Sequence, residues 1–68
     1  MFFLNVLIAE DEKNIRNLLK LHFEQEGYVV LTAQDGIEAL KLIHNKSISI
    51  DLIILDVMMP WLDGFNLP

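Results

Sequence analysis

The sequence has no cysteine and few basic residues, and each shortage excludes a class of protein. Without cysteine, neither a disulfide framework nor a thiolate zinc site can stabilise the fold. Five Lys and Arg stand against ten Asp and Glu, which gives a formal net charge of −5 at pH 7. The bases are also scattered along the chain and form no basic stripe. This composition argues against a nucleic-acid-binding surface.

Long apolar runs are missing as well. No run approaches the roughly 18 residues that a membrane-spanning helix needs. Residues 1–9 resemble the core of a short signal peptide, but they lack a basic start. Glu10-Asp11-Glu12 also stands where a cleavage site of small residues would be expected. We therefore expect a cytoplasmic protein with no membrane contact and a buried strand near its N-terminus.

The chain is short but rich in hydrophobic residues. Its 68 residues are enough for at most one small domain. A chain of this length buries only about 60% of its unfolded surface, so its stability is expected to be marginal. Because 53% of the residues are hydrophobic, we expect part of the apolar surface to pack against protein that these 68 residues do not include.

Three apolar segments predict β-strands. Asn5–Ala9 and residues 50–57 are nearly continuous apolar runs, which are typical of strands covered on both faces. Residues 28–33 are rich in β-branched and aromatic side chains. Residues 58–64 contain a proline and an Asp-Gly pair, which predict a loop.

Two amphipathic segments between the strands predict helices. In the first, one core-facing stripe is expected at helical spacing, made of Ile15, Leu18, Leu19, His22 and Phe23. Gly27 is expected just after the end of this helix. The second helix is expected at residues 36–45, with Asp35 as its N-cap and Glu38 completing a capping box. Its expected core-facing residues are Ile37, Leu40 and Ile43, widened by Ala39 and Leu42.

The order strand, helix, strand, helix, strand predicts the α/β class. Strands that alternate with helices favour a parallel sheet with right-handed crossovers.

Carboxylates follow two of the predicted strands. Glu10 and Asp11 come directly after the first strand, and Asp56 ends the third. In a parallel sheet the carboxyl ends of neighbouring strands lie side by side, so these three side chains are expected to converge. Two carboxylates about 5 Å apart repel by roughly 3 kcal/mol at an effective dielectric near 20. A hard cation would neutralise such a cluster, and oxygen-only ligands suit Mg²⁺.

The third strand and the loop after it carry a recognisable motif. Asp56-Val57-Met58-Met59-Pro60 is followed by Asp63-Gly64. Together with Glu10-Asp11-Glu12, this closely resembles the receiver domain of bacterial response regulators, the phosphoacceptor half of two-component signalling. The resemblance covers essentially the whole chain. It implies a flavodoxin-like fold with helices on both faces of a parallel sheet whose five strands have the order 2-1-3-4-5.

The resemblance also implies a role for each site residue. Asp56 would be the phosphoacceptor and would receive its phosphoryl group from a sensor histidine kinase. Asp11 would bind Mg²⁺ directly, Glu10 directly or through water, and Met58 through its backbone carbonyl. Such a domain is a signalling module that assists its own phosphorylation, not an enzyme in the ordinary sense.

Compared with the family, residues 1–68 are expected to form a truncated receiver. They supply only the first three strands, without the fourth and fifth strands and the later helices. The Ser or Thr and the Lys that contact the phosphoryl group in the family are also absent, so the switching half is expected to be missing. We further expect self-association, for example as a homodimer, through the open edge of residues 50–57.

Two other functions compete with a phosphoacceptor. One is a degenerate receiver-like module that dimerises through its sheet and never cycles phosphate. The other is a metal-dependent phosphatase with an Asp nucleophile, but Met58 stands where such enzymes place a second Asp.

The remaining candidate side chains are expected to be structural: Glu12 and Asp35 at helix starts, Asp63 in a turn, Asp51 where the third strand begins, and His22 and His44 on helices.

Overall fold

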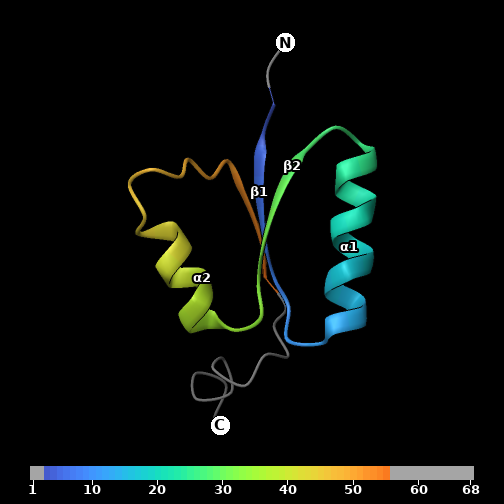
Figure 1. Cartoon of the computed structure of the whole chain (residues 1–68), viewed down its shortest axis with the longest axis horizontal. Helices are drawn as coiled ribbons and strands as arrows, with labels where there is room; N and C mark the ends of the chain where they lie inside the picture. The colour runs from blue at the N-terminus through green and yellow to red at the C-terminus, as the bar shows by residue number, and fades with distance from the viewer. Residues whose placement is uncertain (1–2, 56–68) are drawn as a thin grey trace, which may run out of the picture.

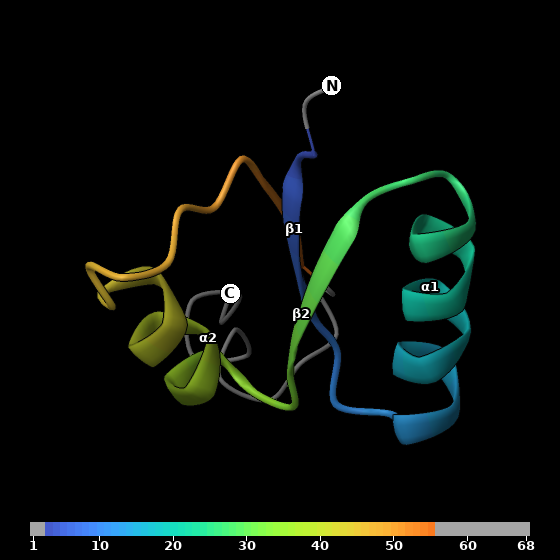
Figure 2. The same cartoon turned by 45° about the horizontal axis from the view of Figure 1, so that its top comes forward.

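The computed structural model describes residues 3–55, which form a three-stranded parallel sheet with a helix on each face (Figure 1). The strand order is β2-β1-β3. A second view shows α1 and α2 on opposite sides of the sheet (Figure 2). The elements are β1 (Asn5–Ala9), α1 (Lys13–Gln25), β2 (Val29–Ala33), α2 (Gly36–Ile43) and β3 (Leu52–Leu55). The predicted class, element order and strand order are confirmed for this part of the chain.

β1 is the central strand and the most deeply buried element. Residues 6–9 are at most 1% exposed, because β2 and β3 flank the strand and a helix covers each face. Leu7 and Ala9 share one face and join Ala33 and Ala39 in the core on the α2 side. The continuous apolar run that predicted a strand covered on both faces was therefore interpreted correctly.

α1 begins and ends with capping interactions that the sequence specifies. The Glu12 side chain accepts a hydrogen bond from the Ile15 backbone N–H at 2.9 Å, which makes Glu12 the N-cap. At the other end Gly27 has a φ of +96°, a conformation that favours glycine. The Tyr28 N–H donates to the Phe23 carbonyl at 3.1 Å, and the two rings lie 5.5 Å apart. This is a Schellman C-cap with its hydrophobic contact.

The core-facing stripe of α1 differs from the predicted one. The half-buried residues of the helix are Arg16, Leu19, Lys20 and Phe23. Ile15 and Leu18 are 48% and 67% exposed, and His22 is exposed too. Because α1 packs mainly on β2 and β1, only a narrow side of the helix is covered. The long stems of Arg16 and Lys20 take part in that cover.

α2 starts at the predicted N-cap, but Glu38 reaches the N–H of Gln34 and not that of the N-cap residue, and a different side of the helix faces the sheet. The Glu38 N–H donates to Asp35 Oδ1 at 2.8 Å, and the Glu38 carboxylate accepts from the Gln34 N–H at 3.4 Å. The helix ends at Ile43, two residues before the predicted end. The predicted stripe was wrong in its main members, which are 67%, 50% and 41% exposed in the order Ile37, Leu40 and Ile43.

Small residues bring α2 close to the sheet. Gly36 and Ala39 are buried, and Leu42 packs against the core. The two residues predicted only to widen the stripe, Ala39 and Leu42, are therefore the ones that face the core. A helix whose apolar arc is this wide can turn its small side inward, because small side chains allow a closer approach.

Asn5 joins the start of β1 to the segment that leads into β3. Its backbone N–H donates to Asp51 Oδ2 at 2.7 Å, and its side-chain amide donates to the Ser49 carbonyl at 2.6 Å. The Asp51 N–H donates to the Asn5 carbonyl at 2.8 Å. The third strand was predicted to begin at residue 50, but β3 begins at Leu52, so Asp51 lies just before the strand and holds it to β1.

Candidate functional site

The carboxyl ends of all three strands lie level with one another. Ala9 of β1 pairs with Ala33 of β2 and with Leu55 of β3. The chain leaves this edge of the sheet after Ala9 as Glu10-Asp11 and after Ala33 as Gln34-Asp35. Asp56 and Met58, which the sequence analysis predicted as phosphoacceptor and carbonyl ligand, lie outside the described residues.

Glu10 is held at this edge and is buried. Its backbone N–H donates to the Ala33 carbonyl at 3.0 Å, so it extends the contact of β1 with β2 by one residue. Its side chain is only 3% exposed, and Oε1 accepts from the Glu12 N–H at a long 3.4 Å. Among residues 3–55 it is the only buried charged side chain. Burying a carboxylate is costly unless a cation or hydrogen bonds compensate it, which is typical of a functional position.

Asp11 has the opposite environment. It is exposed, in the bend between β1 and α1. Its carboxylate makes no hydrogen bond or ion pair with any residue in the described part of the chain. Two consecutive residues after the central strand thus carry a buried and an exposed carboxylate.

Glu12, the third acid of the run, is committed to the helix. Its side chain caps α1 through the Ile15 N–H, as the sequence predicted for a helix-start residue. It is therefore not counted among the metal-binding candidates.

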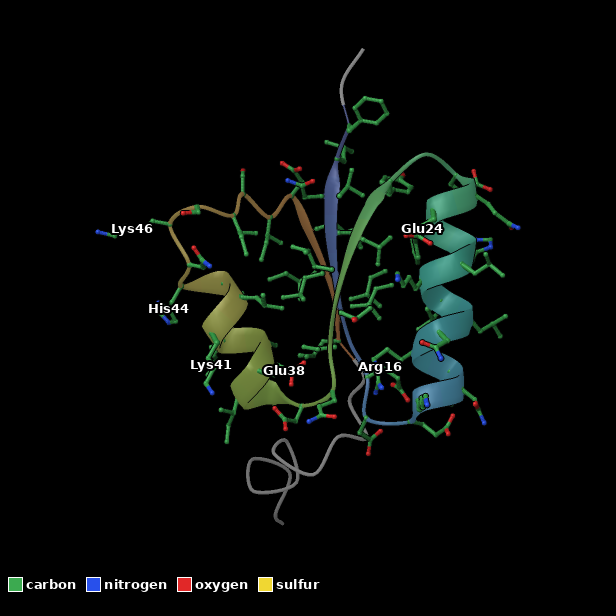
Figure 3. All side chains as sticks on the ribbon, in the orientation of Figure 1. Arg16, Glu24, Glu38, Lys41, His44 and Lys46 are labelled. Atoms are coloured by element: carbon green, nitrogen blue, oxygen red, sulfur yellow. The ribbon has the colours of Figure 1, made fainter. Side chains whose placement is uncertain are left out.

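Arg16 is a residue of this region that the sequence analysis missed. Its Nη1 donates to the Glu10 carbonyl at 2.9 Å and to the Asp11 carbonyl at 3.4 Å. Figure 3 shows the side chain reaching from the first turns of α1 toward this end of the sheet. One signal could have found it, because Arg16 lies four residues after the N-cap Glu12 and so on the same side of the helix.

The chemistry of the described site is that of oxygen donors. Glu10 and Asp11 offer carboxylate oxygens, which suit a hard divalent cation such as Mg²⁺. Within residues 3–55 no group of three or more His, Cys, Asp or Glu side chains forms a metal cluster, and the third predicted carboxylate, Asp56, is not among these residues. His22 and His44 are exposed on or next to helices. Neither helix of residues 3–55 has the length and apolarity to cross a membrane.

Comparison with known proteins identifies the family. The family model for the response regulator receiver domain matches residues 6–68. The chain belongs to this family. The receiver is 48% identical over 61 residues to the alkaline phosphatase synthesis transcriptional regulatory protein PhoP of Bacillus subtilis, covering 90% of this chain and 25% of that protein. It is 53% identical over 62 residues to a probable transcriptional regulator, ycf27, of Cyanidium caldarium, covering 91% and 24%.

A solved structure shows the same fold. The receiver superposes on the chemotaxis response regulator CheY4 of Vibrio cholerae with a TM-score of 0.83 at 37% identity. The match covers 96% of this chain and 52% of that one. The chain therefore spans about half of CheY4 and about a quarter of the transcriptional regulators. The predicted family and the flavodoxin-like fold class are confirmed.

Proposed function

We propose that this receiver accepts a phosphoryl group on Asp56 from a sensor histidine kinase, with Mg²⁺ held by Glu10, Asp11, Asp56 and the Met58 carbonyl. One observation carries the proposal. Glu10 and Asp11 directly follow the end of β1, and Ala9 at that end pairs with Leu55, the residue before Asp56. The acidic pair therefore leaves the sheet beside the last described residue of β3, and Asp56 is the next residue in the sequence.

The donor set supports Mg²⁺ in preference to softer metals. Every predicted ligand is an oxygen, and the chain has no cysteine. Glu10 is buried and anchored by its backbone, whereas Asp11 is exposed, so one carboxylate can be placed in advance and the other can meet a hydrated ion. Bound Mg²⁺ would neutralise charge on the carboxylates and the phosphoryl oxygens.

The residues of the chain supply the nucleophile. A carboxylate oxygen of Asp56 forms a bond to phosphorus while the phosphorus–nitrogen bond of the kinase phosphohistidine breaks, and the electron pair of that bond returns to the imidazole. The product is an acyl phosphate, which adds negative charge and acceptor oxygens at the edge of the sheet. Since relatives are named transcriptional regulators, the signal would control transcription in the protein as a whole.

The test is phosphorylation of the protein by a labelled small phosphodonor such as acetyl phosphate, with and without Mg²⁺. We expect Mg²⁺-dependent, hydroxylamine-sensitive label, because an acyl phosphate is cleaved by hydroxylamine. Asp56→Asn should abolish the label. Asp63→Asn is the matched control, since it removes another aspartate of the same motif and should leave the label in place. Label that survives in Asp56→Asn would show that the acceptor is misassigned.

A second candidate, the receiver-like dimerisation module without phosphate cycling, also has an observation in its favour. The outer side of β3 has no strand partner among residues 3–55, and Leu52, Ile53 and Leu55 are 44%, 46% and 40% exposed. Such an edge can pair with the same edge of a second copy. Concentration-dependent association in sedimentation, together with no label from the phosphodonor, would favour this module over the phosphoacceptor.

A further inference from the structure

Arg16 interacts with the acidic loop through the backbone and not through an ion pair with Asp11. Its Nη1 carries two hydrogens and donates to two consecutive carbonyls, at 2.9 Å to Glu10 and at 3.4 Å to Asp11. The side chain is half-buried and reaches the loop from α1 (Figure 3). A guanidinium stays protonated at any pH a folded protein meets, so these donors are always present.

We infer that Arg16 is a positioning residue, which holds the carbonyls of Glu10 and Asp11 so that their carboxylates keep the placement needed to bind a divalent cation. This inference rests on the proposed function, because it assigns Arg16 to the same metal site.

The loop needs such a contact because it lies outside the sheet. The Glu10 N–H is fixed by the Ala33 carbonyl, but Asp11 and Glu12 form a bend before α1 begins. The bond from the Glu12 N–H to Glu10 Oε1 is long, at 3.4 Å, and contributes little rigidity. The 2.9 Å bond from Arg16 ties this bend to the first turns of a regular helix.

The choice of acceptor also matters electrostatically. A guanidinium that paired with the Asp11 carboxylate would compete with an incoming cation for the same oxygens. By donating to carbonyl oxygens, Arg16 brings a positive charge to the acidic loop and leaves the Asp11 carboxylate oxygens available. Groups that orient metal ligands in this indirect way typically contribute 10- to 100-fold to metal affinity.

Four variants of the protein distinguish a positioning role of Arg16 from an effect of its charge and from an effect of its packing. Arg16→Met keeps an unbranched apolar stem but removes the donors and the charge, whereas Arg16→Lys keeps the charge and one donor group. Lys13→Met removes the same charge from an exposed position at the start of α1. Lys20→Met removes it from a half-buried position one turn after Arg16. No hydrogen bond or ion pair within residues 3–55 involves the side chain of either lysine.

The first readout is the Mg²⁺ dissociation constant, measured by calorimetric titration at fixed ionic strength on variants shown to be folded. We expect Arg16→Met to bind Mg²⁺ about 10-fold more weakly, Arg16→Lys to be intermediate, and both lysine controls to match the unmodified protein. The second readout needs no metal. Amide hydrogen exchange at Asp11 and Glu12 should be faster in Arg16→Met than in either control.

The outcomes that contradict the inference differ from those that contradict the proposed function. Unchanged Mg²⁺ affinity in Arg16→Met, or an equal loss in Lys13→Met, would overturn the positioning role while the metal site stands. A lower unfolding free energy in Arg16→Met with unchanged Mg²⁺ affinity would mean a merely structural role and would overturn it too. An unmodified protein that binds no Mg²⁺ would overturn the proposed site and the assignment of Arg16 together.

Discussion

Two loops leave the same edge of the sheet, and both contain acidic residues, yet they use them differently. After β1 the chain runs through Glu10 and Asp11 to the N-cap Glu12, and after β2 it runs through Gln34 to the N-cap Asp35. In the second loop the acidic side chains serve the helix start, because Asp35 accepts from the Glu38 N–H and Glu38 accepts from the Gln34 N–H. In the first loop Glu12 does so, Glu10 accepts a long 3.4 Å bond from the Glu12 N–H, and Asp11 takes no part.

The hydrogen-bond partners of an acid, and not its residue type, decide whether its carboxylate is available for chemistry. Asp35 and Asp11 are both aspartates two residues beyond the end of a strand. Asp35 is used by the backbone of its own helix, whereas the Asp11 carboxylate has no partner among residues 3–55. Removal of the Asp11 carboxylate should therefore weaken Mg²⁺ binding, whereas removal of the Asp35 carboxylate should lower the free energy of unfolding.

The largest effect is expected at Asp11. Asp11→Asn should weaken Mg²⁺ binding by more than the roughly 10- to 100-fold typical of losing an indirect partner, because a direct ligand would lose its charge. The unfolding midpoint in urea should stay close to that of the unmodified protein, since the carboxylate supports no contact in the described part of the chain. Titration calorimetry and urea unfolding measure the two quantities. A large loss of stability with intact binding would reverse the assigned roles of the two loops.

An effect of about 1 kcal/mol on stability is expected at Asp35. Asp35→Ala removes the N-cap of α2 and leaves the Glu38 N–H without its 2.8 Å bond, and such losses typically cost about 1 kcal/mol. Asp35→Ser should retain most of the stability, because serine is also a good N-cap. Mg²⁺ affinity should be unchanged in both variants. Weaker Mg²⁺ binding in Asp35→Ser would show that the second loop contributes to the site after all.

The smallest effect is expected at Glu12. Glu12→Ala should cost about 0.5 kcal/mol, the low end for N-caps, because glutamate is not among the preferred capping residues. Glu12→Ser should therefore be at least as stable as the unmodified protein. Thermal unfolding of the two variants side by side measures the difference. If Glu12→Ser abolished Mg²⁺ binding, Glu12 would be a ligand and not a cap.

The sequence predicted the sheet well, because strand signals and cap signals are local. The continuous apolar run of β1, the Asp35 cap and the glycine after α1 each depend on a few adjacent residues, and all three are confirmed. The helix faces were predicted less well. Both helices carry apolar residues over a wide arc, so periodicity alone did not indicate that Ala39 faces the core while Ile37 is 67% exposed.

The site was predicted in part for a related reason. Glu10 and Asp11 were found because they directly follow a strand, which needs only the order of residues. Arg16 was missed because its contact depends on where α1 begins and on how its side chain lies. In the sequence it is only one of five basic residues that form no pattern. The position of Asp56 relative to these residues stays a prediction.

The bonds of Asn5 have a consequence at the far end of the sheet. Asn5 fixes Asp51 at the amino edge, and Leu55, four residues after Asp51, pairs with Ala9 at the other edge. Four residues at about 3.3 Å each measure about 13 Å. The bond between Asn5 and Asp51 therefore anchors the register of β3, because it determines which residue of β3 pairs with each residue of β1. A slip of one residue would pair Ala9 with Ile54 in place of Leu55 and turn every side chain of β3 to the opposite face.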